Sequence, residues 1–275
     1  MTEFLSIHEP LFRLASFAAV LAAMALWELA APRRVPALSR WRRWPTNLVL
    51  SALGTVLVRL VLPVVAAATA IEASRRGFGL FNWIGTPAAI AVPVSMVALD
   101  ALIYAQHVVF HRIGLLWRLH RVHHADPDLD VTTGIRFHPV EILISMCVKI
   151  LAVALLGAPL VAVILFEVLL NAAAMFNHSN VRLPVAADRI LRWFIVTPDM
   201  HRVHHSVYRD EHDMNFGFSL SVWDRLFGTY RAQPRDGHEA MRIGLDAFPA
   251  PAPAGLGWSL LNPFSGATER GEQRI

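Results

Sequence analysis

The chain has 275 residues, of which 55% are hydrophobic and only 17% are charged, and its formal net charge is +4. With a mean hydropathy of +0.44, this composition predicts an integral membrane protein rather than a soluble domain. The excess of arginine lies in short loops beside apolar segments, so it indicates membrane topology and we expect no nucleic-acid partner. The only cysteine, Cys147, has no partner, which excludes an intrachain disulfide and an iron–sulfur cluster.

Apolar stretches recur along the chain at lengths that fit membrane-spanning helices. The first covers residues 11–31, the second 46–72 and the third 83–106. Residues 141–176 form a last apolar block, which Gly157-Ala158-Pro159 divides into two arms that each either cross the membrane or re-enter it. The sequence therefore predicts an all-α, polytopic membrane protein with about four transmembrane helices.

The distribution of arginine between the first two loops predicts the orientation of these spans. Arginines 33, 34, 40, 42 and 43 crowd the first loop, whereas the second offers only Arg75 and Arg76. By the positive-inside rule the first loop is cytoplasmic. Counting spans then places the end of the third span and both ends of the last block on that same face, where we expect a cytoplasmic, histidine-rich helical cap.

Two opposite charges interrupt the last apolar block. Lys149 lies eight residues before Gly157, and Glu167 lies eight residues after Pro159. An antiparallel hairpin would set them at similar depth, and an unpaired charge in a membrane is costly. We predict an ion pair between them with a structural role.

Three clusters hold eight of the 13 histidines. Because residues three and four apart share one face of a helix, each cluster can direct two or three imidazoles at one point. Imidazole suits iron, copper, zinc and nickel, whereas calcium and magnesium prefer oxygen ligands. Eight imidazoles exceed the roughly four ligands of one zinc ion, so we predict a site for two metal ions. The clusters are His107-x-x-x-His111, His120-Arg-Val-His123-His124 and His201-Arg-Val-His204-His205.

Two further histidines are candidate ligands because both leave the last apolar block at the depth of the clusters. His178 follows the block, and His138 precedes it in Arg-Phe-His-Pro. The alternative role for His138 is a hydrogen bond that closes the turn before Pro139.

Other polar residues could support the metals. Asp100, Tyr104, His107 and His111 fall on one face of the third span, so Asp100 and Tyr104 are candidates for a supporting or substrate-channel role, or else a polar stripe buried against a neighbouring helix. Metal-bound histidines usually donate their second nitrogen to a carboxylate or carbonyl. Candidate carboxylates, each of which could instead cap a helix, are Asp126, Asp130, Asp199 and Asp224, with Asp199 favoured because it leads into His201.

Two adjacent redox metals could divide the electrons of oxygen reduction, which favours an oxidase. Hydrolysis by two zinc ions on the same histidines stays open, because two-metal sites also activate water. A metal-handling protein without catalysis is a third possibility, although its ligands would be expected inside the spans.

The motifs of residues 95–232 resemble those of the fatty acid hydroxylase superfamily, the sterol desaturase-like membrane di-iron proteins. Besides the three clusters, the resemblance rests on Arg136-Phe-His-Pro-Val-Glu141, Thr197-Pro-Asp-Met before His201, Asn215-Phe-Gly, and Trp223-Asp-Arg-Leu-Phe-Gly-Thr-Tyr230. It implies two iron ions, which zinc could replace, with O2 as co-substrate and hydroxylation or desaturation of a lipid C–H bond. The eight cluster histidines would be ligands, His178 a ninth, and Asn215 would hold a metal-bound water.

The electrons for such a reaction would come from outside the chain. No glycine-rich dinucleotide fingerprint occurs in the sequence, and we expect no fused haem-binding domain of the kind that some relatives carry. We therefore expect an external electron-donor protein or reductase. We divide the chain into N-terminal transmembrane helices (1–82), a di-iron catalytic region (83–232) and a loosely ordered, proline-containing tail (233–275).

Overall fold

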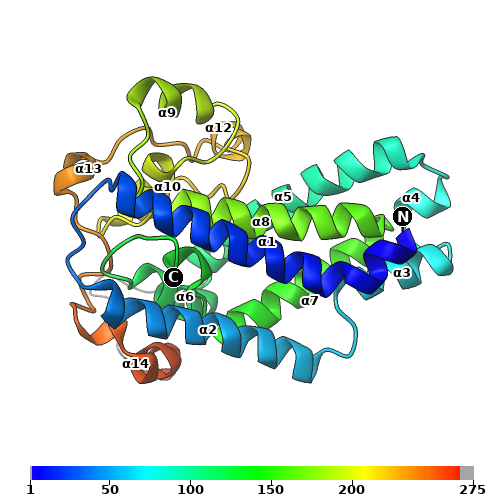
Figure 1. Cartoon of the computed structure of the whole chain (residues 1–275), viewed down its shortest axis with the longest axis horizontal. Coiled ribbons are helices and arrows are strands. Elements are labelled where there is room, and N and C mark those ends of the chain that lie inside the picture. The colour runs from blue at the N-terminus through cyan, green and yellow to red at the C-terminus, as the bar shows by residue number, and fades with distance from the viewer. Residues whose placement is uncertain (1, 267–275) are drawn as a thin grey trace.

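The computed structural model describes residues 2–266, and this part of the chain is predominantly helical (Figure 1). Within these residues the backbone forms isolated β-bridges but no β-strand, which confirms the predicted all-α class. The long helices are α1 (Thr2–Ala30), α2 (Arg40–Val61), α5 (Ala88–Arg112), α7 (Pro139–Leu156) and α8 (Leu160–His178). The shorter ones are α3 (Ala66–Arg75), α4 (Leu80–Trp83), α6 (Gly114–His124), η1 (Thr133–Ile135), α9 (Val185–Leu191), α10 (Pro198–His204), α11 (Arg209–His212), α12 (Val222–Leu226), α13 (Gly237–Ala240), η2 (Ala252–Ala254), α14 (Leu256–Leu261) and η3 (Asn262–Phe264).

Five stretches of the described chain are long and apolar enough to cross a membrane, judged by length and composition. The sequence predicts about four spans. The structure has five because each arm of the last apolar block is a separate helix of sufficient length. The five are Pro10–Ala30, Arg40–Trp83, Ala88–Arg112, Pro139–Leu156 and Leu160–His178.

The long helices lie side by side in a bundle (Figure 1). α1 and α5 both pack on α8, and α2 packs on α7. The start of α1 lies with α3 and α4 at one end of the bundle, whereas α6, α10, α13 and α14 lie at the opposite end (Figure 1). The last turns of α1, α5 and α8 therefore meet at the end that carries the three histidine clusters.

The predicted second span, 46–72, is divided into two helices. α2 ends at Val61 and α3 begins at Ala66. Between them Leu62 is extended, with φ −105° and ψ 110°, as expected for the residue before a proline such as Pro63. The prolyl ring thus separates a long helix from a short one that lies against α7 and α8.

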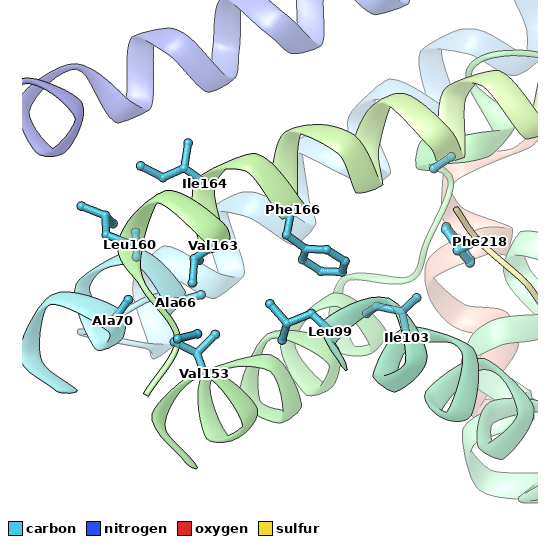
Figure 2. Packing of buried hydrophobic residues seen from close by; sticks show 13 residues of the cluster. Ala66, Ala70, Leu99, Ile103, Val153, Leu160, Val163, Ile164, Phe166 and Phe218 are labelled. Atoms are coloured by element: carbon cyan, nitrogen blue, oxygen red, sulfur yellow. The ribbon is translucent and has the colours of Figure 1, made fainter. Parts of the chain in front are cut away.

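The apolar core lies where α3, α5, α7 and α8 meet. Figure 2 shows Leu99 and Ile103 of α5 facing Phe166 of α8, with Phe218 at one edge of the cluster. The α3 side of this core consists of alanines, including Ala66 and Ala70, whose small side chains let the helix backbones approach closely.

The turn between α7 and α8 is built on Gly157, which has φ +65°. Left-handed backbone of this kind favours glycine. A Cβ atom at Gly157 would lie 2.9 Å from the Phe78 carbonyl oxygen, because the turn packs directly on the segment before α4. The predicted break at Gly157-Ala158-Pro159 is therefore confirmed.

The predicted ion pair in the last apolar block is confirmed. Lys149 Nζ lies 2.8 Å from Glu167 Oε1, and both residues are buried. The Glu167 carboxylate has a second cationic partner from α1, because Arg13 Nη1 lies 3.0 Å from its Oε2. The pair therefore ties α1 and α7 to α8.

The prediction of a loosely ordered tail from residue 233 is wrong for residues 233–266. Arg136 donates hydrogen bonds to the Pro253 carbonyl and to Ser259, and Arg121 donates to Asn262. All three bonds are buried. Proline-rich composition gave no hint of them, because the donors come from segments more than 100 residues earlier.

Candidate metal centre

Nine buried histidines of the described chain converge in two groups. Within each group, one possible ligand atom from each residue lies within 4.8 Å of those of all the others. The five-histidine group consists of His107, His111, His120, His124 and His204, and the four-histidine group consists of His123, His178, His201 and His205.

Each H-x-x-H-H cluster contributes to both groups, and helical spacing explains the division. His120 and His124, four residues apart, both enter the five-histidine group, whereas His123 enters the other group. In the third cluster the arrangement is reversed, since His201 and His205 share the four-histidine group while His204 enters the five-histidine group. Residues at i and i+4 share a helix face, and the histidine next to one of them in each cluster points to a different side of the helix.

The Nδ1 atoms of four of these histidines donate to backbone carbonyls. The N···O distances are 2.8 Å from His107 to Phe216, 3.2 Å from His123 to Arg136, 2.7 Å from His178 to Ala174 and 2.7 Å from His204 to Met214. A carbonyl oxygen only accepts, so Nδ1 carries the proton in each ring. The Nε2 atom of a neutral ring then presents a lone pair to the centre of its group.

Two side-chain carboxylates complete this outer layer. His120 Nδ1 lies 2.6 Å from Glu141 Oε1, and His111 Nδ1 lies 3.3 Å from Asp213 Oδ1. Both contacts belong to the five-histidine group. A carboxylate in this position orients the ring and raises its basicity as a ligand.

The inward nitrogens face one another at distances that fit a shared cation. Nε2 of His107 lies 3.1 Å from that of His120 and 3.0 Å from that of His204. Nε2 of His178 lies 3.1 Å from those of His123 and His201. In the His107–His204 and His123–His178 pairs both rings carry the proton on Nδ1, so two lone pairs face each other and cannot share a hydrogen bond. Two nitrogens bound at about 2.0–2.1 Å to one ion, in contrast, lie roughly 3 Å apart.

Orphaned nitrogens in the same rings support a metal. The Nε2 atoms of His111 and His124 and both ring nitrogens of His205 are buried without a hydrogen-bond partner among the described residues. Such atoms are costly unless a ligand satisfies them. The donor set, all imidazole, fits a borderline transition-metal ion such as iron or zinc.

Burial keeps these ligands neutral. It lowers the pKa of His120 to about 3. The pKa values of His123 and His204 fall well below the usual range, first through burial and then through the proximity of other histidines. Neutral imidazole is the form that binds a metal, so no proton has to leave at neutral pH.

The structure places His138 outside both groups. Its Nδ1 accepts a hydrogen bond from the Val140 amide at 3.2 Å, which caps α7, and its Nε2 donates to the Leu260 carbonyl at 3.3 Å. Both nitrogens are thus engaged, in the turn-closing role that was the alternative to metal binding.

Asp199 and Asn215 also have partners other than the histidine groups. The Asp199 carboxylate accepts from Arg33 Nε at 3.2 Å and from Arg202, so it does not orient His201. Asn215 has φ +54°, and its amide donates to the Met200 and Arg231 carbonyls at 2.8 Å each. The side chain of Asn215 therefore holds two backbone segments together, and its donors are not free for a metal-bound water.

The polar stripe of the third span is buried against α12 and the residues that follow it. Asp100 accepts from Trp223 Nε1 at 2.8 Å, and the Tyr104 hydroxyl lies 2.8 Å from Thr229 Oγ1. Asp224 likewise accepts from the Phe216 and Gly217 amides. It thereby positions the segment whose Phe216 carbonyl orients His107.

The other two predicted carboxylates bind a buried arginine. Arg43 Nε lies 2.7 Å from Asp126 Oδ1, and Arg43 Nη1 lies 2.8 Å from Asp130 Oδ2. This cluster fixes the loop between α6 and α7. The carboxylates that do contact the histidines are Glu141 and Asp213. Neither follows a pattern that predicts such a contact, although Glu141 closes the motif Arg136-Phe-His-Pro-Val-Glu.

The fold and the site define a class of protein. It consists of helical membrane proteins that carry two histidine groups, each suited to a metal ion, at one end of the helix bundle. The chain belongs to the fatty acid hydroxylase family, whose sequence profile matches residues 92–229. All nine histidines of the two groups lie within this range.

Among similar curated proteins, the ornithine lipid hydroxylase OlsE of Rhizobium tropici is 32% identical over 54% of this chain and 44% of its own length. Alkylglycerol monooxygenase of Homo sapiens is 26% identical over 50% of this chain and 30% of its own. Cholesterol 25-hydroxylase of Rattus norvegicus is 24% identical over 52% of this chain and 47% of its own. The chain thus covers less than half the length of these relatives. No solved structure matches it.

Proposed function

We propose that this chain is a membrane-bound, O2-dependent di-iron oxidoreductase that hydroxylates or desaturates a C–H bond of a lipid. The observation that carries the proposal is the pair of buried histidine groups whose inward Nε2 atoms lie 3.0–3.1 Å apart. Further support comes from relatives named as lipid hydroxylases or monooxygenases. Within the proposal, the histidines of the two groups hold the irons.

A pair of bound iron ions would supply the electron transfers that activate oxygen. The chain would supply position and a dry environment. Phe137 stacks on His123 with ring centroids 4.5 Å apart, and Phe218 lies 5.5 Å from His107 and 6.2 Å from His178. These two rings exclude water from one side of the centre and join it to the apolar core, which is the side from which a lipid chain would approach.

Three further parts of the proposal concern the surroundings of the site. The metal centre faces the cytoplasm, because the arginine-rich segment 33–43 lies at the same end of the bundle (Figure 1). Electrons arrive from a separate protein. Tyr104 acts indirectly, through the loop that carries Thr229, rather than by touching a metal.

Metal content of the purified full chain tests the proposal. After expression in iron-replete medium we expect about two irons per chain, one per histidine group, and a loss of at least one in His204→Ala. His138→Asn is the matched control, because asparagine still caps α7 and residue 138 lies outside both groups. Oxygen consumption with a lipid and a reductant should follow the iron content.

The alternatives give different results. Wild-type protein that contains no metal would contradict the two-metal site. An equal loss of metal in His138→Asn and His204→Ala would also contradict it. Two zinc ions that survive iron supplementation, without oxygen consumption, would favour a dizinc hydrolase on the same histidines, since zinc competes well for imidazole.

A further inference from the structure

A pocket of about 480 Å³ lies between the end of α1, the segment 31–39 and residues 180–182, apart from the histidines. Its size is within the range of small-molecule sites. Five of its residues are apolar, and its ionisable residues are four arginines and one glutamate. The apolar ones are Leu29, Pro32, Val35, Pro36 and Leu38, and the ionisable ones are Arg33, Arg34, Arg40, Arg182 and Glu28.

Three of the four arginines are paired with carboxylates. Arg40 Nη2 lies 3.3 Å from Glu28 Oε2, and Arg33 Nε lies 3.2 Å from Asp199. Arg33 and Arg182 both reach the exposed Glu239, at 3.0 and 3.2 Å. These arginines can be held in place without a ligand.

Arg34 is different. Within the described residues no carboxylate oxygen lies within ion-pair distance of its guanidinium, and its Nη1 is buried without a hydrogen-bond partner. The backbone of Arg34 is fixed by Asn180, whose side chain accepts from the Arg34 amide at 3.0 Å and donates to the Arg34 carbonyl at 2.8 Å. A guanidinium that lines a pocket without a carboxylate partner leaves its positive charge available to an anion.

The carboxylate in the pocket does not fill this role. Glu28 is buried, and its Oε1 accepts from the Val131 and Asn180 amides at 2.7 and 2.8 Å, while its Oε2 accepts from Arg40. Its charge is therefore engaged by three donors. Asp128 attracts the Arg34 guanidinium from beyond ion-pair distance, and its carboxylate is engaged by the Ala37 and Leu38 amides.

The position of the pocket identifies the source of the anion. Leu29 lines the pocket and is 65% exposed in the last turn of α1, one residue before the end of the candidate span Pro10–Ala30. Leu26, one turn earlier on α1, is also exposed. Trp27 near the end of α1 and Trp41 at the start of α2 are exposed as well, and aromatic residues are enriched where a span meets the headgroups. Apolar side chains at this position would contribute nothing to the binding of a small free anion, but they can contact an acyl chain.

We propose that this pocket binds the phosphate of an anionic membrane phospholipid. The guanidinium of Arg34 pairs with the phosphate, and the first part of an acyl chain lies on Leu29 and Leu26. Arginine suits this role because its planar fork donates two parallel hydrogen bonds to phosphate oxygens. The proposal concerns residues outside the histidine groups and holds whatever reaction the chain catalyses.

The test measures lipid binding to the full chain in neutral detergent at about 0.15 M salt, where surface charges are screened over roughly 8 Å. The probes are short-chain phosphatidylglycerol, diacylglycerol of the same chain length, and inorganic phosphate. We compare wild type, Arg34→Gln and Arg42→Gln. Arg42 is the matched control, because it carries the same charge in the same region but is exposed and does not line the pocket.

Phosphatidylglycerol at saturation should raise the Tm of wild type and Arg42→Gln by about 5 °C. The Kd of phosphatidylglycerol for Arg34→Gln should be at least about tenfold higher than for wild type. Without lipid, Arg34→Gln should melt no lower than wild type, because the lost side chain has no partner to leave behind. Should the variant fold poorly, Arg34→Lys keeps the charge and should bind with intermediate affinity.

Equal weakening in Arg34→Gln and Arg42→Gln would overturn the proposal in favour of general electrostatic attraction. Equal stabilisation by diacylglycerol would reduce the pocket to an apolar contact. Equal stabilisation by inorganic phosphate would make it a site for a free anion, not for a lipid.

Discussion

At the scale of single residues, Glu141 distinguishes the two histidine groups. Its Oε1 lies 2.6 Å from His120 Nδ1 in a fully buried setting, and Asp213 makes a similar, longer contact with His111. The Nδ1 acceptors identified for the four-histidine group are backbone carbonyls. A negative charge behind a ligand strengthens its bond to a cation, so the five-histidine group should bind a divalent ion more tightly.

Glu141→Gln tests this difference. The amide oxygen can still accept from His120 Nδ1, so ring position is kept while the charge is lost. We expect metal affinity at one of the two sites to fall about 10- to 100-fold, measured by competition with a chelator. The metal content per chain should then drop from two toward one at a chelator concentration that leaves wild type loaded.

Glu72→Gln serves as the control, because Glu72 lies in α3 at the far end of the bundle (Figure 1). Equal loss from both sites in Glu141→Gln, or no loss at all, would show that the carboxylate does not determine affinity.

The sequence identified the nine histidines that meet, but it also included His138 and did not show how the nine divide. The eight cluster histidines and His178 were all candidates, because helical spacing and the ends of spans are local features. The separation of His123 from His120 and His124 depends on where α8 and α10 lie. Backbone acceptors such as the Phe216 carbonyl carry no sequence signal at all. His138 caps α7. It is a histidine at the end of a span, as the ligands are, so sequence spacing could not distinguish it from them.

At the scale of elements, the close approach of η1 to α8 supports the four-histidine group. A Cβ atom at Gly134 would lie only 2.4 Å from the Ala174 carbonyl oxygen, so only glycine fits between the two segments. That same carbonyl accepts the hydrogen bond from His178 Nδ1 at 2.7 Å. The packing of η1 and the orientation of His178 are therefore linked through one atom.

Gly134→Ala should displace either η1 or the Ala174 carbonyl. Overpacking of this kind typically costs about 1–3 kcal/mol, and here it should also turn His178 away from its Nε2 partners. We expect a lower Tm together with loss of about one metal per chain. Gly114→Ala is the control, because a Cβ atom there meets nothing within 4 Å. A lower Tm with both metals retained would contradict the proposed link.

The elements themselves were predictable where local chemistry decides them. Apolar length predicted the long helices, and Gly157-Ala158-Pro159 predicted the break between α7 and α8. α2, however, begins at Arg40, about six residues before the predicted span, and its first turn carries Arg43 into a buried cluster with Asp126 and Asp130. The order of residues 233–266 has the same kind of cause, because buried arginines from much earlier in the chain bind this segment. In both cases the partners are distant in sequence, so local composition could not reveal them.

At the scale of the whole molecule, one topological fact links the metal centre and the arginine-rich segment. Both lie at the end of the bundle where α1, α5 and α8 finish, while α3 and α4 lie at the other end (Figure 1). If the bundle spans a membrane, the orientation of one loop therefore determines the face on which the histidines lie. The positive-inside rule favours the cytoplasm.

Labelling of single cysteines tests this orientation in intact cells. In a Cys147→Ser background, Ala37→Cys reports on the arginine-rich segment and Ser74→Cys on the end of α3; both positions are exposed. A membrane-impermeant maleimide should label Ser74→Cys in intact cells, but Ala37→Cys only after lysis. The reverse pattern would place the metal centre on the outer face. Labelling of both from outside would contradict the bundle itself as a transmembrane unit, because the two positions lie at its opposite ends.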